Sequence, residues 1–202
     1  MAGMEQLLPT AGPGGTSLDG RRVAAVERLL SREGRLADDP ADPGGITNYG
    51  VSIRYLKRLS AADRRKLAQA GLAIPSQVTA DTIRNLMRSD ATIIYSVLWW
   101  DALEYGALPD PIAAKTLDLA VNMGPVQGHR LVQRACRAHG RKIADDGDLG
   151  PISRDTIAAI GPDLIHAIRS EAAGYYRLLA ATTQFGGRFL GGWLARAYDE
   201  DA

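Results

Sequence analysis

Residues 33–50 read EGRLADDPADPGGITNYG, and this segment decides how the rest of the chain is interpreted. Apolar residues recur at helical spacing over the preceding residues 22–32, so a helix is predicted that ends at Gly34, where a left-handed glycine commonly closes a helix. Glu33 then lies on the core-facing side of the last turn. Partial burial and the negative end of the helix dipole both disfavour an ionised carboxyl group there. Glu33 is therefore the first candidate for a general acid.

The loop after this helix is dense in carboxylates and turn-forming residues. Asp42-Pro43-Gly44-Gly45 has the composition of a tight turn, which holds Asp42 at its corner. Residues 46–51 roughly alternate apolar and polar side chains, which predicts a short strand or extended arm with Thr47 on its polar side. We expect Glu33, Asp42 and Thr47 to direct their oxygen atoms towards one cleft.

Several short motifs in this segment resemble the signature of glycoside hydrolase family 108, a family of lysozyme-like N-acetylmuramidases that are often phage endolysins. They are Glu33-Gly34, Asp39-Pro40, Asp42-Pro43-Gly44-Gly45, Thr47-Asn48 and Gly50-Val51. The resemblance implies a mainly α, lysozyme-like helical globule with a small loop or β-arm next to the catalytic glutamate. It also implies cleavage of the β-1,4 bond between N-acetylmuramic acid and N-acetylglucosamine in peptidoglycan, with Glu33 as general acid. The family usually has Gly-Tyr where this chain has Arg35-Leu36.

Under this interpretation the remaining residues of the segment take supporting roles. Asp42 orients water or stabilises the oxocarbenium-like transition state, and Thr47 holds the nucleophilic water. Asp39 is the alternative second carboxylate and, with Asn48, is expected to bind substrate. The alternative without chemistry is that Glu33 is a solvated helix end and the loop is a plain or cation-binding turn. A calcium loop is disfavoured because the ligands do not alternate around a central glycine.

Two further substrate contacts are expected outside this segment. Trp99 and Trp100 end an apolar helical stretch; core packing accounts for one, and Trp100, which matches a tryptophan of the family, is expected to meet a sugar ring. Residues 118–124, DLAVNMG, resemble the D-x-A-V-N-x-G element of the same family. Asn122 at the end of that helix either presents its amide to an N-acetyl group or caps its own helix.

The chain divides into three expected parts: a flexible tail over residues 1–19, a lysozyme-like catalytic region over 20–108, and a peptidoglycan-binding helical region over 109–198 packed into the same globule. Asp110-Pro111 predicts the start of a helix with Asp110 as its N-cap. Residues 146–151, DGDLGP, resemble a motif of peptidoglycan-binding repeats, read physically as a tight turn that feeds a helix. The ending FLGGWLAR, residues 189–196, is similar to the close of the family, and its tryptophan predicts that the terminus packs back onto the globule.

Composition excludes several classes of function. The net charge is +1, which gives no electrostatic case for nucleic acid. The single cysteine, Cys136, is expected in the core, and the three histidines lack metal-ligand spacing, so no metal or cofactor is expected. No apolar run reaches the length of a membrane span, and residues 1–17 do not read as a secretory signal. We therefore expect a monomer made in the cytoplasm that reaches the cell wall or periplasm after release by a holin or similar factor.

Two rival functions stay open from the sequence. A lytic transglycosylase would use the same glutamate on the same bond and form an anhydro sugar. A non-catalytic cell-wall-binding or phage structural module is favoured by the replacement of Gly-Tyr after Gly34. Digestion of purified sacculi, with analysis of the products, separates these possibilities from a muramidase.

Overall fold

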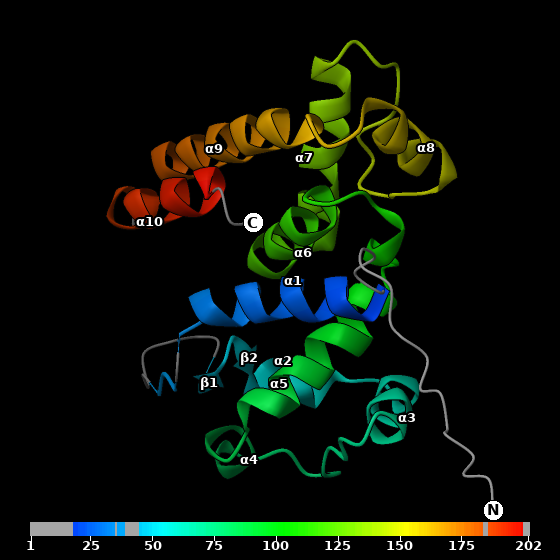
Figure 1. Cartoon of the computed structure of the whole chain (residues 1–202). Helices are drawn as coiled ribbons and strands as arrows, with labels where there is room; N and C mark the ends of the chain where they lie inside the picture. Colours follow the sequence, from blue (N-terminus) through cyan, green and yellow to red (C-terminus); the bar gives the residue numbers. More distant parts are fainter. Residues whose placement is uncertain (1–17, 35, 39–44, 184–185, 200–202) are drawn as a thin grey trace, which may run out of the picture.

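The computed structural model describes residues 18–34, 36–38, 45–183 and 186–199. This part of the chain is mainly helical and carries one two-stranded sheet, which confirms the predicted fold class. Helix α1, Leu18–Arg32, runs through the middle of the molecule (Figure 1). The hairpin and helices α2 to α5 lie on one side of it, and helices α6 to α10 lie on the other.

Helix α1 forms as its apolar periodicity predicts. Ala25, Val26, Leu29 and Leu30 are buried along one face. The backbone N–H of Glu33 donates to the carbonyl of Leu29 at 3.1 Å, so Glu33 extends the last helical turn by one residue. The expected left-handed cap is wrong, because Gly34 does not have a positive φ. The helix thus delivers Glu33 to the expected place without that cap.

A β-hairpin follows, in place of the single strand or arm that the alternation predicted. Strands β1, Thr47–Asn48, and β2, Val51–Ser52, pair antiparallel. Tyr49 has φ 50° and Gly50 has φ 75°, the left-handed conformations of a type I′ turn, which suits the twist of a two-residue hairpin. Ala37 pairs with Thr47 through two backbone hydrogen bonds of 2.8 and 2.9 Å, which holds the hairpin against the segment after Glu33.

Short helices complete this side of the molecule. Ser52 and Ser60 each accept a backbone N–H at a helix start, so the chain breaks at Ser60. The elements are α2 Ile53–Arg58, α3 Ala61–Gln69, α4 Ala80–Arg84, α5 Arg88–Tyr95, the π-helical segment η1 Ser96–Asp101 and the 3-10 turn η2 Tyr105–Ala107. Helix α5 starts at Arg88, and the carboxylate of Asp90 in its first turn accepts from the backbone N–H of Met87.

The other side is built from longer helices: α6 Ile112–Met123, α7 Pro125–Ala138, α8 Pro151–Ile160, α9 Leu164–Thr182 and α10 Gly186–Tyr198. Asp110 does not cap α6 as predicted; its carboxylate binds Arg21 of α1 at 2.7 Å, and Pro111 occupies the N-cap. Helices α6 and α7 approach closely at Gly128, where a Cβ would lie 2.9 Å from the backbone nitrogen of Ala120. Helices α9 and α10 lie side by side (Figure 1).

The hydrophobic core is continuous from one side of α1 to the other, and it includes Leu56 and Ile94 on one side and Leu117 and Ile168 on the other. Trp193 of α10 stacks on Tyr176 of α9 at 5.6 Å and 20°, so the C-terminal helix packs back onto the globule as predicted. Cys136 is a buried core residue, also as expected, and burial raises the pKa of its thiol to about 11. The three-part division of the chain stays a prediction.

A helix that crosses a membrane must be long and apolar, and this was compared with the helices of the described residues. None of them combines the length and the apolar character that a membrane span requires.

Candidate active site

Glu33 lies where the two sides of the molecule meet. Its side chain is 18% exposed, and its Oε1 accepts a hydrogen bond from the guanidinium NH2 of Arg196 at 2.7 Å. Arg196 comes from α10, 163 positions further along the chain. The first and last described helices are therefore joined at the proposed acid.

The hairpin turn forms the opposite wall of this site. A Cβ placed on Gly50 would lie 2.8 Å from Oε2 of Glu33 and 2.5 Å from the hydroxyl oxygen of Tyr95. That hydroxyl donates to the carbonyl of Tyr49 at 3.2 Å, which fixes the turn against α5. Burial, and secondarily the charge of Glu33, raises the pKa of Tyr95, so its phenol stays protonated. One carboxyl oxygen of Glu33 thus faces Arg196, and the other faces a glycine that leaves it room.

A buried ionic cluster holds Arg196 in place. Its Nε donates to Oδ1 of Asp118 at 2.9 Å, and the Asp118 side chain is only 3% exposed. Arg32 lies 3.5 Å from the same oxygen, and Lys115 lies 3.7 Å from Oδ2 while donating to the carbonyl of Arg196. Among the described residues, Oδ2 of Asp118 has no hydrogen-bond partner. Both the side chain and the backbone carbonyl of Arg196 are therefore fixed by neighbours in addition to its contact with Glu33.

The cluster sets the charges of its members. Burial alone would lower the pKa of Arg196, but the carboxylates of Asp118 and Glu33 outweigh burial and raise it, so this guanidinium stays charged. Burial lowers the pKa of Lys115 to about 8, against the opposing attraction of Asp118. Near neutral pH the cluster thus places two arginines and a lysine around Asp118 and Glu33.

The arrangement constrains how Glu33 can act as an acid. Sequence reasoning expected Glu33 to be partly buried at the end of its helix, and the structure adds a guanidinium that lies 2.7 Å from its Oε1. Oε1 already accepts the hydrogen bond from Arg196. An acid role therefore requires the proton on Oε2, the oxygen that faces Gly50 and the hairpin.

The other predicted catalytic residues are less well defined. Thr47 begins the hairpin, is partly buried, and donates its hydroxyl to the carbonyl of Gly45 at 3.3 Å. It lies on the same hairpin as Gly50. Asp39 and Asp42 fall outside the described residues, so their roles stay predictions.

Two of the residues expected to contact substrate, Asn48 and Trp100, have buried side chains that contact other parts of the protein. Asn48 is 6% exposed, and its amide donates to the carbonyls of Ile83 and Leu86, both at 3.1 Å, which ties the hairpin to the end of α4. Trp100 is 3% exposed and meets the ring of Tyr105 edge-on at 6.4 Å. Neither side chain offers a substrate an accessible surface, so we leave both out of the proposed site.

Asn122 is in a different position. It is exposed near the end of α6, and its Oδ1 accepts from the hydroxyl of Tyr176 at 2.7 Å. It also lines a hollow of about 420 Å³ beside the ionic cluster, together with six other residues. The lining residues are Arg32, Asn122, Gly192, Trp193, Ala195, Arg196 and Asp199.

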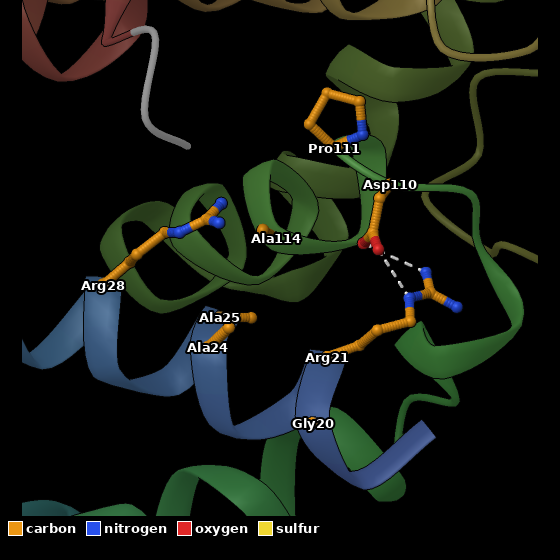
Figure 2. Close-up of a pocket in the computed structure, with 8 residues that line it drawn as sticks. All are labelled: Gly20, Arg21, Ala24, Ala25, Arg28, Asp110, Pro111 and Ala114. Atoms are coloured by element: carbon orange, nitrogen blue, oxygen red, sulfur yellow. Dashed lines mark hydrogen bonds and ion pairs between the residues drawn. The ribbon is translucent and has the colours of Figure 1, made fainter. Parts of the chain in front are cut away.

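A second hollow, of about 350 Å³, lies between the first turns of α1 and the start of α6 (Figure 2). The Arg21–Asp110 ion pair borders it, and Arg28 lines it from further along α1. The α1 residues that line it belong to the earlier turns of that helix, whereas Glu33 follows the last turn. This hollow is therefore separate from the candidate active site.

The DGDLGP turn is organised around Gln133 of α7. The Gln133 Oε1 accepts from the backbone N–H of Gly147 at 2.8 Å, and its Nε2 donates to the carboxylate of Asp146 and the carbonyl of Asp148, also at 2.8 Å. Ser153, in the first turn of α8, donates to the same carbonyl at 3.3 Å. These contacts stabilise the turn itself. The described residues contain no group of three or more His, Cys, Asp or Glu arranged to hold a metal ion.

Sequence reasoning missed the role of three residues. Arg196 was visible as the last residue of the FLGGWLAR ending, but the motif carried no hint of its partner. Asp118 was visible as the first residue of DLAVNMG, but no catalytic role was assigned to it. Gly50 ends the segment 33–50, but its importance depends on the positions of Glu33 and Tyr95.

Comparison with known proteins identifies one sequence family. Residues 26–124 match the family described as glycosyl hydrolase 108, and the matched region runs from within α1 to the end of α6. It includes Glu33, Gly50 and Asp118, whereas Arg196 lies beyond it. No curated protein matches the chain.

Solved structures that share the fold include SagA of Brucella abortus. The TM-score is 0.61 at 22% identity, over 91% of this chain and 99% of that one. The similarity at this identity concerns the fold, and it extends well beyond the region that matches the family.

Proposed function

Since residues 26–124 belong to glycosyl hydrolase family 108, which makes this chain a peptidoglycan-acting glycoside hydrolase, we propose that it is an N-acetylmuramidase with Glu33 as its general acid. The bond cleaved is the β-1,4 linkage between N-acetylmuramic acid and N-acetylglucosamine. The main support for the proposal is the position of the Glu33 carboxyl group. Glu33 is 18% exposed between α10 and the hairpin, with one oxygen on Arg196 and the other opposite Gly50.

In the proposed reaction, Oε2 of Glu33 gives its proton to the glycosidic oxygen as the bond breaks. The carboxylate that remains is stabilised by the guanidinium of Arg196, 2.7 Å from Oε1, so the charge that forms on Glu33 has a fixed partner. Because Asp118 and Lys115 hold Arg196 before substrate arrives, this partner does not have to reorganise during the reaction.

The second half of the reaction needs a nucleophilic water and a group that directs it. Thr47 and Asp42, with Asp39 as the alternative carboxylate, keep these roles as proposals. Glycan strands of peptidoglycan are the proposed binding partner of a monomeric enzyme. We further propose synthesis in the cytoplasm and access to the wall through a holin or similar release factor, as in a phage endolysin.

The direct test compares Glu33→Gln with wild type on purified sacculi, followed as turbidity loss and as new reducing ends. General acid catalysis contributes about 10²- to 10⁴-fold, so we expect a loss of at least about 100-fold. Glu27→Gln is the matched control, because Glu27 lies on the same helix and also pairs with an arginine, Arg88 at 2.6 Å, but on an exposed surface. It should digest sacculi at the wild-type rate.

Binding and product analysis complete the test. Both variants should sediment with sacculi, which shows that loss of digestion is not loss of binding or folding. Mass spectrometry of the products should show reducing N-acetylmuramic acid ends; 1,6-anhydro ends would assign a lytic transglycosylase instead. Equal rates for Glu33→Gln and wild type would remove the enzymatic proposal and leave a wall-binding module.

A further inference from the structure

The hollow beside the ionic cluster has no role in the mechanism above. Its volume of about 420 Å³ falls within the range of about 300–1,000 Å³ that is usual for small-ligand sites. Arg196 forms part of its wall and also binds Oε1 of Glu33 at 2.7 Å. Only the side chain of Arg196 therefore lies between a ligand in the hollow and the proposed acid, Glu33.

Asn122 offers an oriented hydrogen-bond donor at this hollow. Its Oδ1 accepts from the hydroxyl of Tyr176 at 2.7 Å, which fixes how the amide plane is turned. Within the described part of the chain its Nδ2 has no hydrogen-bond partner. A side-chain amide in this state can donate to the carbonyl oxygen of a ligand without giving up its contact to the protein.

Trp193 adds apolar aromatic surface to the lining beside that donor, and Phe189 packs against its ring at 5.9 Å. The indole is only partly buried, and stacking on Tyr176 at 5.6 Å holds it in place. A rigid, partly exposed aromatic ring beside a polar group is a common contact for the apolar side of a ligand. Tyr176 thus positions both Asn122 and Trp193.

The charged residues of the hollow are already paired. Arg196 binds Asp118 and Glu33, and Arg32 binds Asp199 and lies 3.5 Å from Asp118. An anionic ligand would have to compete with these carboxylates for the two arginines. The lining therefore favours an uncharged ligand that carries a carbonyl acceptor and an apolar face.

We propose that this hollow binds an N-acetylhexosamine residue of the substrate glycan, with Asn122 donating to the acetamido carbonyl and Trp193 covering the sugar ring. The inference rests on the proposed function, because it takes the ligand from the same glycan. It adds a subsite contributed by α6 and α10 on the Arg196 side of Glu33, opposite the hairpin. The hydrogen bond from the Asn122 amide to the acetamido carbonyl would then make this subsite specific for acetylated sugars.

The test measures binding of tetra-N-acetylchitotetraose, a peptide-free probe, to the full chain by titration calorimetry. Asn122→Asp keeps an oxygen that accepts from Tyr176 but removes the Nδ2 donor, and its melting curve shows whether the added carboxylate beside Arg32 and Arg196 leaves the fold intact. Loss of one such hydrogen bond should weaken binding about five- to tenfold. Asn85→Asp, the same substitution at an exposed position at the end of α4, should bind as wild type does.

A second probe tests the acetyl group itself. Cellotetraose, an uncharged β-1,4 tetramer with hydroxyl groups in place of the acetamido groups, should bind wild type more weakly than the acetylated probe, and Asn122→Asp should not weaken it further. The inference is overturned if Asn122→Asp binds the acetylated probe like wild type, or if wild type binds both probes equally.

Different results would refute the proposed muramidase activity and the proposed subsite. A chain that digests sacculi but binds the probe independently of Asn122 keeps the proposed function and loses the subsite. A chain that binds the acetylated probe through Asn122 but does not digest sacculi keeps the subsite and loses the activity.

Discussion

The replacement Gly50→Ala tests the site at its tightest point. The new Cβ would lie 2.8 Å from Oε2 of Glu33 and 2.5 Å from the Tyr95 hydroxyl, whereas ordinary contacts begin near 3.4 Å. The carboxyl must therefore retreat by about 0.6 Å and the hydroxyl by about 0.9 Å. Since a misplacement of about 1 Å can cost about 100-fold in rate, we expect a loss of roughly 10- to 100-fold on sacculi.

The same replacement also strains the backbone, because Gly50 has φ +75°. An alanine in that conformation costs about 1–2 kcal/mol, which lowers the melting temperature by roughly 2–8 °C in a chain of this size. Gly140→Ala is the matched control: its φ is +77°, and nothing lies within 4 Å of the added Cβ. It should lose similar stability and keep the wild-type rate.

The assay is the initial rate of sacculus digestion, read together with the melting curve of each variant. The reasoning is refuted if Gly50→Ala, shown to be folded, digests sacculi as fast as Gly140→Ala does. It is also refuted if both variants lose activity in the same proportion, since the effect would then follow backbone strain and not the position of Glu33.

Three further predictions concern stability. Burial lowers the pKa of Lys115 in the folded protein to about 8 from an ordinary 10.5, so below pH 8 its charged form costs about 3 kcal/mol of stability. The free energy of unfolding should therefore rise between pH 8 and 10, because the folded protein loses this charge as the pH increases. Urea unfolding should show this rise in wild type and not in Lys115→Met; equal slopes would contradict it. Burial lowers the pKa of His129, so the stability linked to its neutral form is complete above pH 6.5 and is lost as the pH falls through the lowered pKa. The free energy of unfolding of His129→Gln should therefore fall less steeply with decreasing pH than that of wild type. An equal fall in both proteins would count against this prediction. Gly128→Ala would place a Cβ 2.9 Å from the backbone of Ala120 and should destabilise the α6–α7 pair by about 1–3 kcal/mol in the same urea assay, a neutral result being the contrary outcome.

Sequence reasoning succeeded where the determining signal is local. The apolar spacing before Glu33 is a property of consecutive residues, and α1 forms with the buried face that this spacing predicts. The position of Glu33 at the end of that helix follows from the same pattern. The return of Trp193 to the globule was also predictable, because a large apolar ring near the end of a chain gains by burial.

What the sequence could not predict concerns residues whose partners are distant or whose orientation is set by packing. No local pattern reports that Arg196 meets Glu33, since 163 positions separate them. Asn48 was expected to bind substrate because it is polar and lies near the glutamate, but two backbone carbonyls of the α4 region take its amide. Trp100 and Trp99 are neighbours in one apolar stretch, and only the fold decides that Trp100 is the buried one.

The contact between Arg196 and Glu33 has a consequence for biosynthesis. While the chain emerges from a ribosome, Glu33 is exposed to the cytoplasm long before α10 exists, and nothing then fixes its carboxyl group. The guanidinium arrives only with the last described helix, so a nascent or prematurely terminated chain lacks the assembled site. Chains stopped after Thr183 should therefore fail to digest sacculi even where they remain folded, and full digestion by such a truncated chain would show that the late contact is dispensable.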